Sequence, residues 1–232
     1  MRKYLAPLAV KLGLYKRIVK IDTYFKQKKA ARSFQRYGLE TLQKADEALS
    51  SVGGHLTLYF GTLLGAIREK GFIPYDYDLD VALPIEERPD DIVELMARYG
   101  FKHDCQQYIK ETGRIIFDRF VYHGTQIDFD YIFSDRDDGK MYTYIVRRHE
   151  TKEWREANAT DGFPCDIWPL EKCGFERADF LGLKLYIPEK SHQWMKDIYG
   201  ETYMTPIKSW DAKNQKTVME HSRERAYRRY LS

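Results

Sequence analysis

Three aspartates at one point in the chain alternate with other residues: Asp76, Asp78 and Asp80, followed by the apolar run 81–83. In a β-strand every second side chain points to the same face, so these carboxylates would lie side by side. Neighbouring carboxylates repel one another, and folding alone gains little from that. A divalent cation that prefers hard oxygen ligands, Mg²⁺ or Mn²⁺, removes the repulsion. The spacing therefore predicts a metal-dependent site.

A second candidate strand, residues 126–131, carries Asp128 and Asp130 in the same alternation. Two strands of this kind would supply one metal site, so the predicted ligands are Asp78, Asp80, Asp128 and Asp130. The residues alone leave open whether Asp128 or Asp130 completes the site.

A Gly-Thr pair, Gly61-Thr62, precedes a short helical pattern that extends to Arg68. Backbone N–H groups at a helix start are suited to hold a phosphate, and glycine lets a ligand approach closely. A cation that neutralises a diphosphate and orients an attacking hydroxyl is sufficient for phosphoryl transfer. The two acidic strands and the Gly61-Thr62 helix start together indicate phosphoryl transfer.

The remaining pattern predicts an α/β (α+β) fold with a mixed β-sheet flanked by helices. We find no repeat and no linker that divides the chain. Helices are expected at 33–51, 61–68, 89–100 and around 194–199, with a basic helix at 213–230. Strands are expected at 55–60, 77–83, 101–109, 114–122, 125–133 and 141–146, with a tight turn at His123-Gly124.

Composition narrows the class of protein. The chain has 232 residues, 43% of them hydrophobic and 15% aromatic, which is enough for one sizeable core. The three cysteines, Cys105, Cys165 and Cys173, lack C-x-x-C spacing, which argues against a disulfide framework and a structural zinc site. We expect no transmembrane helix, because no run of about 18 apolar residues occurs. A cytoplasmic location is predicted.

The first 32 residues form a basic amphipathic arm with ten Lys or Arg and one acid, Asp22. Three interpretations stay open: packing on the domain, peripheral contact with anionic lipid at the inner face of the membrane, and nucleic-acid binding. The last is the least favoured, since no nucleic-acid module accompanies the charge, and we expect no nucleic-acid partner. The predicted division is an arm, 1–32, and a catalytic domain, 33–232.

The stretch 60–82, FGTLLGAIREKGFIPYDYDLDVA, closely resembles the LicD/fukutin family of nucleotidyltransferase-fold phosphotransferases. The Gly-Thr-Leu-Leu-Gly-Ala turn, an Arg, Gly-Phe-Ile-Pro and the clustered acids occur in order without a gap. Weaker matches follow at 127–129, 163–171, 180–188 and 199–206. The resemblance covers about residues 33–210 and leaves out the arm and the last segment.

This resemblance implies transfer of a phospho-substituent, such as phosphocholine or a polyol phosphate, from a CDP-linked donor. The acceptor would be a hydroxyl of a glycan or glycolipid, and CMP would be released. Asp78 and Asp80 would hold Mg²⁺ or Mn²⁺, with Asp128 as the third ligand and candidate base. The groups implied for the donor phosphates are Gly61, Thr62 and Arg68.

The sequence leaves several alternative residue roles and functions open. Asp166 stands before Ile167 in a setting similar to that of Asp128 and competes for its role. Asp76 could satisfy loop amides at the start of the strand instead of acting in chemistry. For the whole protein, the alternatives are a D-x-D glycosyltransferase that uses a nucleotide sugar and a non-catalytic nucleotide- or glycan-binding protein. Release of CMP or of a nucleoside diphosphate distinguishes the two enzymes.

Overall fold

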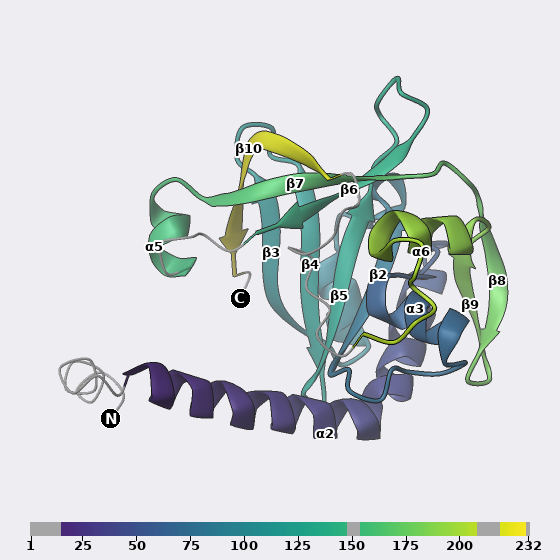
Figure 1. Cartoon of the computed structure of the whole chain (residues 1–232), viewed down its shortest axis with the longest axis horizontal. Coiled ribbons are helices and arrows are strands. Elements are labelled where there is room, and N and C mark those ends of the chain that lie inside the picture. Colours follow the sequence, from purple (N-terminus) through teal and green to yellow (C-terminus); the bar gives the residue numbers. More distant parts are fainter. Residues whose placement is uncertain (1–14, 148–153, 208–218, 231–232) are drawn as a thin grey trace.

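The computed structural model describes residues 15–147, 154–207 and 219–230. Its centre is a mixed sheet of ten strands in the order β6-β7-β10-β3-β4-β5-β2-β1-β9-β8 (Figure 1). The β2–β5 and β1–β9 pairs are parallel and the other pairs are antiparallel. The strands are β1 (Thr57–Leu58), β2 (Asp78–Pro84), β3 (Lys102–Ile109), β4 (Ile115–Tyr122), β5 (Thr125–Ile132), β6 (Met141–Val146), β7 (Phe163–Leu170), β8 (Phe175–Phe180), β9 (Leu183–Pro188) and β10 (Glu220–Arg229).

Helices cover the sheet on both faces. The long helix α2 and the short helix α4 pack on one face, and α3 packs against β2 from the other side with α6 beside it (Figure 1). A short 3₁₀ turn, η1 (Ile85–Glu87), follows β2. The helices are α2 (Tyr15–Ser50), α3 (Phe60–Arg68), α4 (Ile92–Arg98), α5 (Trp154–Ala159) and α6 (Ser191–Tyr199).

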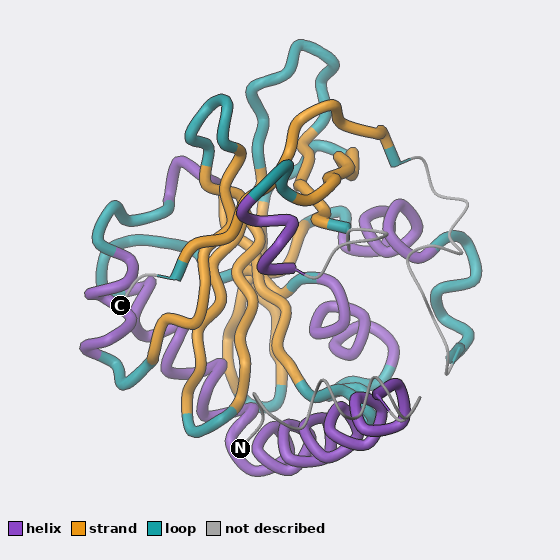
Figure 2. The backbone as a smooth tube through the Cα atoms, turned by 90° about the vertical axis from the view of Figure 1, so that its left-hand side faces the viewer, coloured by secondary structure: helices purple, strands orange, loops and turns teal. Residues whose placement is uncertain are grey.

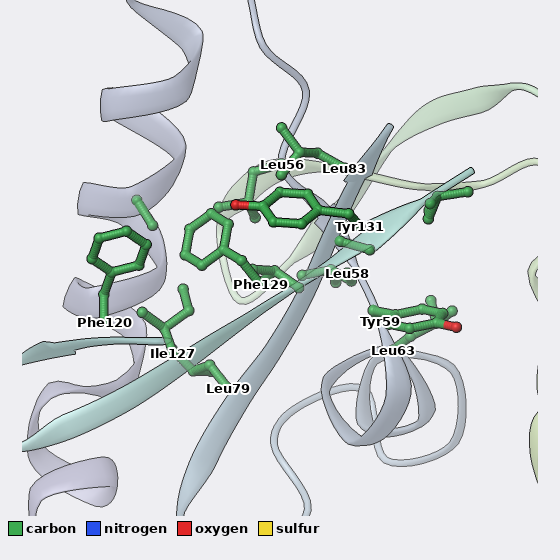
Figure 3. Packing of buried hydrophobic residues seen from close by; sticks show 14 of the residues in the cluster. Leu56, Leu58, Tyr59, Leu63, Leu79, Leu83, Phe120, Ile127, Phe129 and Tyr131 are labelled. Atoms are coloured by element: carbon green, nitrogen blue, oxygen red, sulfur yellow. The ribbon is translucent and has the colours of Figure 1, made fainter. Parts of the chain in front are cut away.

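Strand alternation separates an apolar face of the sheet from a polar one. On the apolar face Leu79 of β2 lies opposite Ile127 of β5, and Phe120 of β4 packs edge-on against Phe129 at 5.4 Å between ring centroids (Figure 3). All four side chains are fully buried. Helix α2 covers them through apolar residues at helical spacing, namely Leu42, Ala45 and Leu49. Burial of this face leaves the opposite side chains of the same strands to form a site.

The second half of the sheet turns across the first. Strands β6 and β7 run across the ends of β3, β4 and β5, and β10 bends from β7 to the side of β3 (Figure 1). Figure 2 shows the same sheet turned by 90°. A single bridge between Phe133 and Tyr142 joins the end of β5 to β6. These strands therefore form a curved wall behind the polar face of the sheet.

The predicted mixed sheet with flanking helices is confirmed. Strands β2 to β6 and helices α3, α4 and α6 lie where the pattern placed them, apart from end residues. The turn between β4 and β5 has φ of 47° at His123 and 83° at Gly124, as a two-residue hairpin turn of type I′ requires. The predicted strand at 55–60 is shorter, because only Thr57–Leu58 pairs and α3 begins at Phe60.

Two predicted helices need correction. The basic helix expected at 213–230 is wrong for its described part: Glu220–Arg229 is strand β10, between β3 and β7. The open edges of β3 and β7 offer backbone hydrogen bonds that outweigh the helical preference of a charged sequence. Residues 213–218 lie outside the described residues.

The other helix, expected at 33–51, starts much earlier. Helix α2 runs without a break from Tyr15 and so passes through the proposed boundary between 32 and 33. In Figures 1 and 2 its first half extends past the ends of the strands. The division into an arm and a domain stays a prediction, and residues 1–14 of the arm lie outside the described residues. Among the helices that are described, none combines the length and the apolar character needed to span a bilayer.

Candidate active site

Four of the predicted carboxylates meet on the polar face of two adjacent strands. Asp80 of β2 lies directly opposite Asp128 of β5 in the parallel register, and Asp78 and Asp130 stand one step away on either strand. Neighbouring strands are about 4.8 Å apart, so these side chains share one small volume. The expected convergence of acids from two strands is present, while the roles given to each residue remain predictions.

The Gly61-Thr62 pair lies against this acidic cluster (Asp78, Asp80, Asp128 and Asp130). The Gly61 N–H donates a hydrogen bond of 2.9 Å to Asp80 Oδ2, and the Asp80 N–H donates one of 2.9 Å to Thr62 Oγ1. A Cβ at position 61 would lie 3.0 Å from Asp80 Oδ2, a tight contact that glycine avoids. Both residues therefore fix Asp80 in this structure, and their predicted contact with donor phosphates stays a prediction.

Asp128 has a partner that the sequence did not indicate. Arg119 of β4 lies directly opposite it and donates from Nε to Oδ1 at 2.7 Å and from Nη2 to Oδ2 at 2.6 Å. Arg119, Asp128 and Asp80 thus form one row across three strands. Nothing in the local sequence around Arg119 marks it, because only the register of β4 against β5 brings it to the site. The fork holds a carboxylate in a fixed plane more firmly than a single bond would.

Burial and mutual repulsion raise the pKa values of the other carboxyls. The pKa of Asp78 rises to about 7 because the group is buried, with further contributions from Asp128 and Asp76. Burial and the charges of Asp78 and Asp128 raise the pKa of Asp80 well above its usual range. The pKa of Asp130 is raised in the same way, by burial first and by Asp128 second. The ionised carboxylates of the cluster therefore lack enough nearby positive charge to offset their burial and mutual repulsion.

This shortage fits a divalent cation. The donors are hard carboxylate oxygens, and both Asp78 and Asp80 carry less negative charge than they would beside a cation. As arranged among the described residues, no three His, Cys, Asp or Glu side chains form a ready-made metal-binding group. Both oxygens of Asp128 instead accept hydrogen bonds from Arg119. The carboxylates therefore suit a divalent cation chemically, but Asp128, the third predicted ligand, is hydrogen-bonded to Arg119 in this arrangement.

A pocket of about 330 Å³ opens beside the acidic cluster. Asp78 and Gly61 line it, and several tyrosines contribute to its walls. Asp76 also lines it, and burial raises the pKa of this carboxyl to about 6 although Arg68 opposes the rise. The other lining residues are Leu64, Arg68, Ile73, Tyr75, Tyr77, Tyr199, Thr202, Tyr203, Thr205 and Ile207.

Arg68 is held at the wall of this pocket. Its Nε donates to Glu69 Oε1 at 2.7 Å and its Nη1 donates to the Tyr203 carbonyl at 3.2 Å. The side chain is only 7% exposed, which places its charge close to the pocket and to Asp76. Tyr199 ends α6 and also lines the pocket.

Asp166, the competing candidate, lies away from the acidic cluster. It is on β7, which β10, β3 and β4 separate from β5 in the order of the sheet. Its carboxylate pairs instead with Arg147 and His221, each at 2.8 Å. Of the two candidates, Asp128 is the one that lies opposite an aspartate of β2, while the role itself stays a prediction. Between Asp128 and Asp130, Asp128 lies opposite Asp80 and also acts on the charge of Asp78.

The fold and the site define a class: a mixed sheet with a glycine-containing helix start, two aspartates on one strand and a third on its neighbour. Residues 54–190, more than half of the chain, match the family described as LicD/FKTN/FKRP, nucleotidyltransferase domain. The chain belongs to this family, as the resemblance at 60–82 implied.

The chain is also similar, at low sequence identity, to curated proteins. The chain is 23% identical over 185 residues to human ribitol-5-phosphate transferase FKTN and 25% identical over 186 residues to the mouse protein. Each alignment covers 79% of this chain but only 36% of the human and 37% of the mouse protein. A third similarity, 31% over 78 residues, is to an uncharacterized Rickettsia typhi protein and covers 33% of the chain and 25% of that protein.

Proposed function

We propose that this protein transfers a phospho-substituent from a CDP-linked donor to a hydroxyl of a glycan or glycolipid and releases CMP. The observation that carries the proposal is the register of Asp80 against Asp128, beside a pocket large enough for part of a nucleotide. Membership of the LicD family supports the reaction class. The name of the similar FKTN proteins makes a polyol phosphate, ribitol 5-phosphate, the first substituent to test.

Each residue has a defined task in this proposal. The nucleoside enters the tyrosine-lined pocket, where Tyr75 and Tyr77 offer flat faces and Arg68 offers positive charge. Asp78 and Asp80 would hold Mg²⁺ or Mn²⁺, and Gly61 keeps Asp80 in place. The cation, when bound, neutralises the diphosphate and makes its phosphorus more electrophilic.

The reaction itself is an in-line displacement. The acceptor oxygen forms a bond to the β-phosphorus of the donor, and the bond from that phosphorus to the bridging oxygen breaks. CMP leaves with the bridging oxygen and its electron pair. A carboxylate of the acidic cluster accepts the hydroxyl proton, and Asp128 is the candidate because it faces Asp80. Positioning and charge neutralisation supply most of the rate enhancement.

The test measures the nucleotide that is released. The full chain is incubated with CDP-ribitol, CDP-choline or a nucleotide sugar, with Mg²⁺ or Mn²⁺ or with EDTA, and CMP is quantified. We expect CMP only with metal and a CDP-linked donor, and at least about a hundredfold less with Asp78→Asn. The matched control is Asp137→Asn, an exposed loop aspartate. Release of a nucleoside diphosphate would identify a glycosyltransferase, and binding without release would identify a non-catalytic protein.

A further inference from the structure

We propose that Arg119 is a latch on Asp128: it occupies the third carboxylate of the site until a cation arrives, and then turns to the phosphates of the donor. This inference rests on the proposed function for the identity of the donor. Its first part, the competition between Arg119 and a cation, concerns metal binding alone and can be tested without turnover.

Geometry supports the competition. The two nitrogens of Arg119 approach both oxygens of Asp128, at 2.7 and 2.6 Å, and so use the side of the carboxylate from which a cation is best bound. A second carboxylate, Asp80, lies directly opposite Asp128 on the next strand. Among the described residues no three ligands are assembled for a metal, although the strands bring the acids together. In this arrangement both oxygens of Asp128 accept hydrogen bonds from Arg119.

The charges around Arg119 support the second part of the proposal, in which Arg119 turns to the phosphates of the donor. Arg119 acts on Asp78 and Asp130 as well as on Asp128, so its guanidinium faces several members of the acidic cluster. Asp78 in turn lines the pocket. A guanidinium displaced from Asp128 at this position is next to the place where the diphosphate would lie. Planar guanidinium groups bind phosphate oxygens with the same two-pronged geometry that they use for carboxylates.

Mobility of the latch is consistent with its surroundings. The Arg119 side chain is 25% exposed and stacks only over Phe117, with Cζ 5.5 Å from the ring centroid. A buried arginine that directly follows η1, Arg88, is 8% exposed and has three acceptors: Asp118, Tyr131 and the Pro89 carbonyl. Arg119 thus has fewer constraints than an arginine that only stabilises the fold.

The experiment measures Mn²⁺ binding to the full chain by electron paramagnetic resonance, with and without CDP. We expect Arg119→Gln to bind Mn²⁺ alone at least about tenfold more tightly than the wild type, which corresponds to about 1.4 kcal/mol. We also expect CDP to increase the Mn²⁺ affinity of Arg119→Gln by a smaller factor than that of the wild type. Arg114→Gln, which removes an arginine that pairs with Asp135, should behave like the wild type.

Two further variants keep the test decisive if Arg119→Gln folds poorly. Arg119→Lys retains the charge without the fork and should give an intermediate Mn²⁺ affinity. In an Asp128→Asn background, replacing Arg119 should change Mn²⁺ affinity little, because the competition has been removed. Unchanged or weaker Mn²⁺ binding by Arg119→Gln would overturn the latch. If CMP release fails while Mn²⁺ binding still tightens, the latch stands and the proposed reaction is wrong.

Discussion

The backbone amide of Gly61 and the carboxylate of Asp80 are joined by a hydrogen bond of 2.9 Å, which ties the start of α3 to the acidic strand β2. A side chain at this position would crowd the carboxylate, because its Cβ would lie 3.0 Å from Asp80 Oδ2. Glycine at position 61 therefore favours the packing of this site, whatever it contributes to phosphate binding.

Gly61→Ala should lower activity sharply and cost about 1–3 kcal/mol of stability, because its Cβ would lie 3.0 Å from Asp80 Oδ2 and 3.2 Å from Asp76 Oδ2. CMP release and thermal unfolding measure the two effects. Gly71→Ala is the matched control, since a Cβ there meets only Leu181 at an ordinary 3.6 Å. Equal behaviour of the two variants would show that the contact with Asp80 is unimportant.

The metal-free protein should lose stability as the pH rises through about 6 to 7. Asp76 and Asp78 have pKa values of about 6 and 7 in the fold, above their unfolded value. Between the unfolded pKa and these folded pKa values, the folded state binds more protons than the unfolded state. The free energy of unfolding therefore falls as the pH rises through this interval. Each kcal/mol lost lowers the Tm by about 2–4 °C for a chain of this size. Thermal unfolding in EDTA from pH 4 to 8 measures this slope.

Asp78→Asn serves as the internal check on that pH dependence. The variant removes one titrating group and one repulsive charge, so its Tm should be higher at pH 8 than that of the wild type and should fall less between pH 5 and 8. Saturating Mg²⁺ should reduce the slope of the wild type as well, because the cation offsets the same repulsion. Parallel slopes for the two proteins would contradict the assignment.

Asp118 should be essential for folding but not for metal binding. It is fully buried on the apolar face and accepts hydrogen bonds from Tyr131 at 2.7 Å, Gln106 at 2.9 Å and Arg88 at 3.1 Å. Asp118→Ala leaves the buried charge of Arg88 without its carboxylate partner and should lower the free energy of unfolding by about 3–5 kcal/mol. Urea unfolding measures the cost, and Mn²⁺ affinity per folded molecule should not change. Asp137→Ala, an exposed aspartate, should be neutral in both assays.

The tyrosine-lined pocket predicts where nucleotide affinity resides. Tyr75→Ala should raise the KM for the donor about five- to a hundredfold with a smaller change in kcat, because stacking of a base on an aromatic ring contributes about 1–3 kcal/mol. Steady-state CMP release and CDP-induced thermal shifts both measure the effect. Val52→Ala, a half-exposed apolar residue outside the pocket, is the control. A change in kcat alone would place the donor elsewhere.

Local patterns in the sequence were sufficient for strands β2 to β6, for helices α3, α4 and α6, and for most of the acidic cluster. The alternation at 76–80 and 126–131 determined which carboxylates share a face, because side-chain direction in a strand depends only on position along that strand. The two-residue turn at His123-Gly124 was predictable for a similar reason, since few residues adopt positive φ. The last strand, β10, was not predictable, because its structure depends on the open edges of β3 and β7.

The sequence by itself determined that acids alternate along two strands and that a glycine precedes the helix beside them. Only the tertiary structure decided that β2 and β5 are adjacent and parallel, that Asp80 faces Asp128, and that Arg119 closes on Asp128. It also decided that Asp166 lies elsewhere, bound to Arg147. The physical reason is that strand register and pairing are set by burial of the whole apolar face. No single segment of the sequence carries that information.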